Sequence, residues 1–153
     1  MSNPTTMSNT AEGNNTESTR SVVIERVFPH SPEKLWRALT ESSLVAQWLF
    51  KNDFEPVPGR KFQFRADPVP QWDGVVDCEV LVVDPLKQLS YSWGSLGLDS
   101  VVHFTLTPAE GGTHLRMEQS GFRPDQKQAY GGATYGWKHF FDGLERVLGG
   151  GAA

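Results

Sequence analysis

The stretch YGGATYGWKHFFDGLERVL, residues 130–148, decides the fold. From position 137 onward, apolar side chains follow the i, i+3, i+4, i+7 spacing of one helical face, and charged side chains fill the positions between them. The pattern predicts one long amphipathic helix of roughly 28 Å. Burying its apolar face is worth on the order of 10 kcal/mol before entropy is counted, so the helix needs a broad apolar partner surface. That face consists of Trp137, Phe140, Phe141, Leu144, Val147 and Leu148.

Alternating apolar and polar residues between positions 22 and 119 predict the strands of that surface. A first strand is expected over residues 22–28, and five more follow at residues 62–64, 72–82, 89–93, 101–106 and 115–119. Short connections rich in Gly and Pro imply antiparallel pairing of neighbours. Each strand has one apolar face, as expected of a sheet that a helix covers on one side.

Between the first two strands, Ser31, Pro32 and Glu33 have the order of a helix start: a cap, a first helical position and an acidic first turn. Two short helices are expected here, with apolar faces that include Leu35 and Trp48, and Thr40 is a possible cap for the second helix. The sequence therefore predicts an α+β fold with a curved six-stranded antiparallel sheet, two short helices and a long C-terminal helix across the concave face.

Composition limits the remaining possibilities. The 153 residues suit a single domain, expected over residues 21–149, with a disordered tail at 1–20 and a disordered end at 150–153. The net charge of -4 and scattered Lys and Arg disfavour nucleic acid as a partner. The single cysteine, Cys78, is typical of a reducing compartment, and no apolar leader or membrane span is visible. We expect a cytoplasmic protein that has no membrane contact.

Four segments resemble one known family. SPEKLWRALT at 31–40 is similar to its PxxVWxALT signature, and PGRKF at 58–62 to its PGGxF strand entry. YSW at 91–93 and GWKHFFDGL at 136–144 resemble its YxW and GWxxFLxxL segments. Together they resemble the SRPBCC, or START-like, superfamily, in the branch named for the activator of the 90-kDa heat-shock protein ATPase. The resemblance implies a helix-grip fold with a cavity between the sheet and the last helix.

The aromatic residues predict what that cavity would bind. Rigid flat side chains concentrated on the inner faces are typical of a small-molecule site. The expected ligand is a small apolar or aromatic molecule of unknown identity, with no cofactor and no metal. The predicted lining is Trp36, Trp48, Phe62, Phe64, Trp72, Tyr91, Trp93, Phe104, Met117, Gln119, Tyr130, Trp137 and Phe141. Since buried phenols and indoles need hydrogen-bond partners, an unpaired one would indicate a missing ligand.

Two other classes of function stay open. An enzyme of the cyclase or hydrolase type, acting on an aromatic or polyketide-like substrate, needs an ionisable group facing the cavity, for which Glu25, Arg26 and His103 are the candidates. No catalytic residue is assigned, because no nucleophile or metal-ligand motif occurs. A protein-interaction module, such as a chaperone regulator, needs an exposed apolar patch instead.

Glycines in the first half of the predicted long helix have two possible explanations. Gly131, Gly132 and Gly136 each cost about 1 kcal/mol relative to Ala in a helix interior. They allow close packing against another backbone, or they leave this half weak enough to act as a gate.

Overall fold

The computed structural model describes residues 19–151. The tail expected at 1–20 lies outside this range except for its last two residues, of which Arg20 already begins the first strand. Residues 152 and 153 of the expected disordered end also lie outside it.

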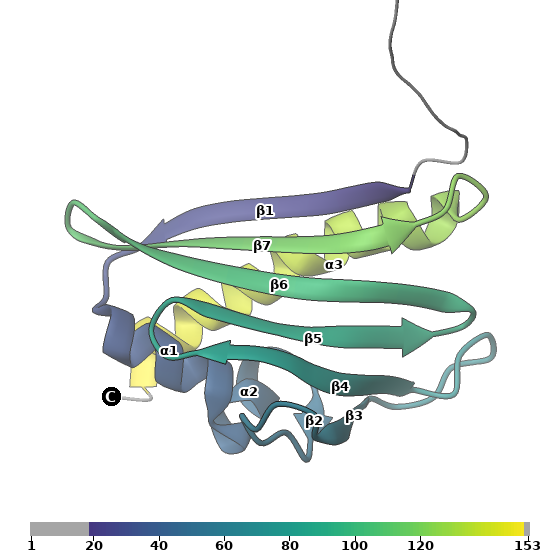
Figure 1. Cartoon of the computed structure of the whole chain (residues 1–153), viewed down its shortest axis with the longest axis horizontal. Helices are drawn as coiled ribbons and strands as arrows, with labels where there is room; N and C mark the ends of the chain where they lie inside the picture. The colour runs from purple at the N-terminus through teal and green to yellow at the C-terminus, as the bar shows by residue number, and fades with distance from the viewer. Residues whose placement is uncertain (1–18, 152–153) are drawn as a thin grey trace, which may run out of the picture.

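One antiparallel sheet contains every strand of the described residues, in the spatial order β1-β7-β6-β5-β4-β3-β2 (Figure 1). Consecutive strands from β2 to β7 are neighbours, which is the expected meander, and β1 closes the order by pairing with β7. The strands are β1 (Arg20–Phe28), β2 (Lys51–Asn52), β3 (Lys61–Arg65), β4 (Val75–Asp84), β5 (Gln88–Ser95), β6 (Leu98–Ala109) and β7 (Gly112–Phe122).

Two short helices, α1 (Pro32–Thr40) and α2 (Ser42–Trp48), follow β1 as predicted. The Ser31 side chain caps α1 by accepting the backbone N–H of Lys34 at 3.2 Å, and Pro32 takes the first helical position. The cap predicted at Thr40 is wrong. The Thr40 hydroxyl donates back to the Trp36 carbonyl at 2.7 Å, still within α1, and Glu41 precedes α2 instead.

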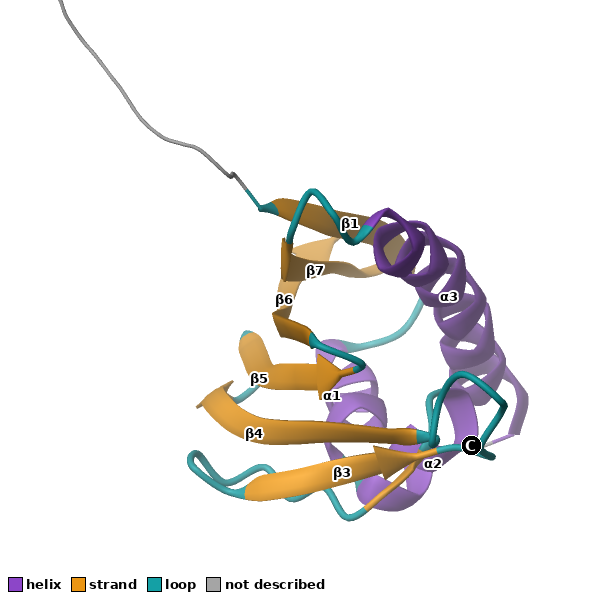
Figure 2. Ribbon diagram, turned by 90° about the vertical axis from the view of Figure 1, so that its right-hand side faces the viewer, coloured by secondary structure: helices purple, strands orange, loops and turns teal. Residues whose placement is uncertain are grey.

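The long helix α3 (Lys127–Arg146) continues into a π-helical turn over Val147–Gly151. Figure 2 shows α3 crossing the open side of the curved sheet, with α1 and α2 below it. Its buried side chains Trp137, Phe141 and Leu144 pack on the inner faces of the strands. The predicted helix-grip arrangement is therefore confirmed.

The sheet differs from the prediction at three places. The strand expected from residue 72 begins at Val75, so Trp72 lies in the loop before β4. A seventh strand, β2, has only two residues, too few for any alternation to show in the sequence, and it pairs with Phe64 and Arg65 at the sheet edge. Beside it, the backbone N–H of Gln63 donates to the Asp53 carboxylate at 2.8 Å. A register shift between Val80 and Val82 turns Val82 outward, although simple alternation placed it on the inner face.

Candidate functional site

The predicted lining residues mostly form one packed interior. Nine of the thirteen are buried, and their rings contact one another directly. Phe104, for example, lies edge-on to both Trp48 and Trp137, with ring centroids 6.5 and 6.0 Å apart. The buried nine are Trp48, Phe62, Phe64, Tyr91, Phe104, Met117, Gln119, Trp137 and Phe141. In this structure the protein's own side chains therefore occupy much of the space in which a ligand was expected.

A chain of hydrogen bonds crosses this interior. The Trp137 indole donates to Oε1 of Gln119 at 2.7 Å, and Nε2 of Gln119 donates to the Ser100 hydroxyl at 2.9 Å. The Ser100 hydroxyl in turn donates to the backbone carbonyl of Trp93 at 2.8 Å. Gln119 was expected to line the ligand site, but both ends of its amide are already paired within the protein.

A half-buried aromatic cluster lies at the edge of the interior. Its members are Phe50, Trp72, Trp93 and Phe140, and we call it the aromatic mouth. The Phe50 ring is central, with centroid distances of 6.1 Å to Trp72, 6.4 Å to Trp93 and 5.3 Å to Phe140. Because these rings are packed on one another yet reach the surface, the mouth offers apolar contact area to a molecule arriving from solvent.

Sequence reasoning assigned only Trp72 and Trp93 of this mouth to the ligand site. Phe140 lies on the predicted apolar face of the helix, so its periodic position was a usable signal. Phe50 lies two residues after the end of α2, in a segment whose Pro, Gly and Asn content indicated a loop, and no periodicity marks it. Its role depends on contacts with residues far away in the sequence.

Two predicted lining residues lie elsewhere. Trp36 is half-buried on α1, at the end of the sheet opposite the turn between β5 and β6 (Figure 1). Tyr130 is half-buried near the start of α3, where its ring packs edge-on to Phe122 with centroids 5.5 Å apart. The Tyr130 hydroxyl donates to the Ser21 carbonyl at 3.3 Å, so this residue joins α3 to β1.

The two halves of α3 are held very differently. The C-terminal half contains all the fully buried side chains of the helix, and Arg26 of β1 forms ion pairs with its Asp142 and Glu145 at 3.1 and 3.0 Å. The first half, residues 127–136, has no fully buried residue, and no side chain caps its start. The aromatic mouth lies against this helix through Phe140.

The glycines of the first half are not explained by close packing, contrary to one of the two expectations. A Cβ added at Gly131 or Gly132 would meet no atom within 4 Å, and one at Gly136 would touch only the Phe140 ring at 3.8 Å. Gly143, in the other half, does lie close to a backbone, with the Trp48 carbonyl 3.5 Å from its added Cβ. Gly131 and Gly132 therefore weaken the helix and have no steric reason to be glycine.

The groups that an enzyme would need are not gathered in the interior. Glu25 and His103 lie on the convex face, and Glu25 is 2.9 Å from Nε2 of His114. Arg26 points toward the concave side, at the edge strand, where its guanidinium is paired with the two carboxylates of α3. Burial raises the pKa of the Cys78 thiol, with Asp77 adding to the effect, so this sulfur is a poor nucleophile.

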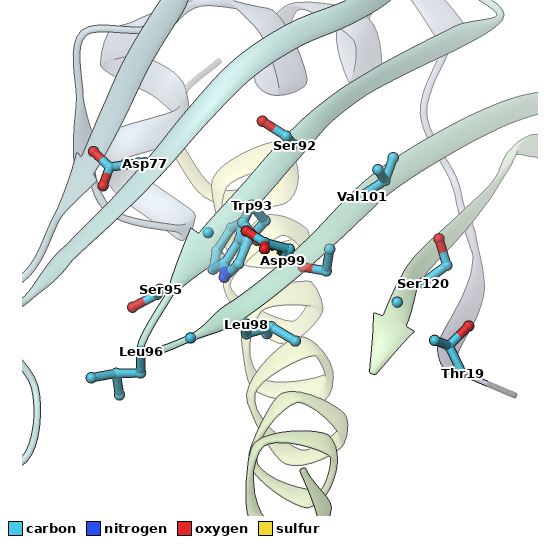
Figure 3. Close-up of a pocket in the computed structure, with 14 residues that line it drawn as sticks. Thr19, Asp77, Ser92, Trp93, Ser95, Leu96, Leu98, Asp99, Val101 and Ser120 are labelled. Atoms are coloured by element: carbon cyan, nitrogen blue, oxygen red, sulfur yellow. Dashed lines mark hydrogen bonds between the residues drawn. The ribbon is translucent and has the colours of Figure 1, made fainter. Parts of the chain in front are cut away.

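Open hollows lie on the convex face of the sheet, away from α3. The hollow in Figure 3 has a volume of about 730 Å³, and Asp77, Ser92 and Asp99 point into it from β4, β5 and β6. Two neighbouring hollows of about 590 and 490 Å³ also include Asp77 in their walls. Carboxylates and hydroxyls would leave an apolar ligand largely hydrated there, so these hollows do not suit the ligand class that the sequence predicts.

Within residues 19–151, no helix is both long enough and apolar enough to cross a membrane. Large exposed apolar side chains, such as Val23 on β1, Leu96 in a turn and Tyr135 on α3, are distributed over separate elements of the described chain. Over the same residues, no three His, Cys, Asp or Glu side chains come together as a metal site would require.

A curved antiparallel sheet that grips a long C-terminal helix defines a helix-grip protein of the SRPBCC superfamily. Residues 29–149 match the family described as activator of Hsp90 ATPase homolog 1-like protein, and the chain belongs to this family.

Solved structures agree with this assignment. Protein MLL2253 from Mesorhizobium loti is 58% identical, with a TM-score of 0.80 over 84% of this chain and 96% of that one. The Aha1 dimer from Colwellia psychrerythraea is 20% identical, with a TM-score of 0.75 over 88% of this chain and 99% of that one. Protein BH1534 from Bacillus halodurans is 23% identical, with a TM-score of 0.73 over 86% and 99%. The last two likenesses show the fold alone. No curated protein matches the chain.

Proposed function

We propose that the protein binds a small apolar or aromatic molecule between the first half of α3 and the concave face of the sheet, entering at the aromatic mouth. The single observation that carries this proposal is the mouth itself: four aromatic rings, packed on one another and left half-buried, of which Phe140 lies on α3 one turn past the half of the helix that has no buried side chain. Membership of the SRPBCC superfamily supports the same class of ligand.

Entry requires the first half of α3 to move together with Trp137 and Phe140, which follow it directly, because these two rings close the packed interior behind the mouth. The rings of Trp93 and Trp137 are 5.7 Å apart, and Phe140 closes over Trp137 at 5.5 Å. Gly131 and Gly132 lower the cost of such a movement, while the Arg26 ion pairs keep the end of the helix, at Asp142 and Glu145, in place. The site is thus a minor open state that a ligand populates by binding to it preferentially.

A fluorescence titration tests the proposal. Fluorene, a neutral aromatic hydrocarbon, is added to the protein while tryptophan emission is followed, since Trp72, Trp93 and Trp137 all lie in or next to the mouth. We expect a saturable change. Phe140→Ala should weaken binding about tenfold, as expected for an aromatic contact worth roughly 1.4 kcal/mol.

A matched control lies on the same helix. Tyr135 is an aromatic residue with 77% of its surface exposed, so Tyr135→Ala removes a ring of similar size without touching the mouth. Its affinity for fluorene should equal that of the unchanged protein. The proposal fails if fluorene gives no saturable change, or if the two alanine variants weaken binding equally.

A further inference from the structure

Tyr91 carries the one phenol group of the buried interior, and its hydroxyl has no hydrogen-bond partner among residues 19–151. The residue is only 3% exposed, so water does not replace the missing partner at the surface. Burial raises the pKa of the Tyr91 phenol, and the neighbouring Cys78 adds to this, so the hydroxyl keeps its proton in the neutral range. A buried donor without an acceptor costs stability, and such groups in native proteins call for an explanation.

Other aromatic polar groups around the interior do have partners. The Trp48 indole donates to the Ala38 carbonyl at 2.8 Å, and the Trp72 indole donates to the Ser95 hydroxyl at 2.8 Å. Trp137 and Tyr130 are paired as described above. Trp36 and Trp93, whose indoles donate to no described residue, are only half-buried. Among the fully buried aromatic donors of the described chain, Trp48 and Trp137 are paired and Tyr91 is the exception.

Four rings surround Tyr91 and connect it to the aromatic mouth. Its ring centroid lies 5.9 Å from Phe54, 5.4 Å from Phe62, 5.8 Å from Phe64 and 6.0 Å from Phe104. Phe64 also contacts two rings of the mouth, Phe50 at 6.2 Å and Trp93 at 5.3 Å. A molecule that enters at the mouth thus meets Phe64 first and the Tyr91 ring next.

We infer that Tyr91 is the polar anchor of the ligand site and that the ligand is a neutral, largely aromatic molecule carrying a carbonyl or similar hydrogen-bond acceptor. This inference rests on the proposed function and names its ligand class. The Tyr91 hydroxyl, which is unpaired in the fold, donates a hydrogen bond to the acceptor of the ligand. The surrounding rings contact the aromatic part of the ligand. The four rings that contact Tyr91 are phenylalanines and carry no charge, so they offer no counter-ion to an anionic ligand.

A matched pair of probes tests the anchor. Fluorene and 9-fluorenone have the same ring system, and only the ketone offers an acceptor. The unchanged protein should bind 9-fluorenone more tightly than fluorene. Tyr91→Phe should weaken 9-fluorenone binding about threefold to tenfold, the range of one neutral hydrogen bond, and leave fluorene binding unchanged. The infrared carbonyl band of bound 9-fluorenone should shift to lower frequency, and the shift should vanish in the variant.

The stability of the ligand-free variant is a second, independent readout. Because the Tyr91 hydroxyl is unpaired, Tyr91→Phe should leave the urea midpoint unchanged or raise it. Tyr135→Phe is the control, because it removes an exposed hydroxyl outside the interior and should change neither the midpoint nor the binding of either probe. A lower midpoint for Tyr91→Phe, or failure of this variant to fold, shows that the hydroxyl is paired and overturns the anchor.

The binding outcomes separate the two proposals. Binding of both probes with no difference between Tyr91→Phe and the unchanged protein overturns the anchor and leaves the proposed function standing. Absence of binding by both probes refutes the proposed function, and the anchor falls with it.

Discussion

Replacement of Gln119 by Met is the sharpest test of how the interior is held together. Gln119 is 1% exposed, and its amide bridges the Trp137 indole and the Ser100 hydroxyl. Methionine keeps a similar length and shape but removes both amide atoms. The Ser100 hydroxyl still donates to the Trp93 carbonyl, whereas the Trp137 N–H, on a residue only 2% exposed, is left without an acceptor.

The expected loss is about 1 to 3 kcal/mol of unfolding free energy, which is the cost of leaving one buried donor unpaired. For a domain whose total stability is about 5 to 15 kcal/mol, this shift is easily measured. Urea unfolding followed by far-UV circular dichroism gives the midpoint and the slope, and the slope should not change.

A double-mutant cycle with Trp137→Phe isolates the interaction. Phenylalanine removes the N–H donor, so the double variant has neither the donor nor its acceptor. Its loss should be smaller than the sum of the two single losses by about 1 to 2 kcal/mol, as for directly contacting partners. Strictly additive losses, or a Gln119→Met variant as stable as the unchanged protein, would refute the assignment of this hydrogen bond.

Three further outcomes are expected. The Arg116 guanidinium donates to Glu118 at 2.9 Å and lowers the pKa of that carboxyl below its usual 4.5, so the pair stabilises the fold above that pH and its contribution is lost as the pH falls through the lowered value. Urea midpoints measured toward acid pH should thus fall more steeply for the unchanged protein than for Glu118→Gln, and parallel curves would contradict this. The buried Cys78 thiol should resist a disulfide-forming thiol reagent at mildly alkaline pH until urea is added, and fast labelling of the folded protein would contradict its placement. Ser31→Ala should cost about 1 kcal/mol in thermal or urea unfolding because the α1 cap is lost, while Ser31→Asp should not.

Features that depend on local pattern could be predicted from the sequence. The spacing of Trp137, Phe141 and Leu144 identified α3 and its buried face, and the Ser31-Pro32 pair marked the start of α1. Alternation placed Tyr91 and Gln119 on the inner side of the sheet, because side chains of a regular strand point to opposite faces in turn. These signals each extend over a few residues and need no knowledge of the partner.

Features that depend on distant partners could not be predicted. The shift that turns Val82 outward arises in the pairing of β4 with β5, and nothing within β4 marks it. Phe50 belongs to the mouth because rings from β3, the loop before β4, β5 and α3 converge on it. The sequence also could not show whether Gly131 and Gly132 serve close packing, because the space around them is defined only in the folded chain.

The two-residue strand β2 also limits aggregation through the edge of the sheet. A long edge strand with unpaired backbone groups would allow the same strand of another molecule to pair with it and start a fibril. Here the edge strand consists of Lys51 and Asn52 alone. Beyond it, the backbone N–H of Gln63 on β3 donates to the Asp53 carboxylate. A negative charge stands where a foreign strand would have to join, so concentrated solutions of the protein should stay clear of edge-to-edge aggregation on this side.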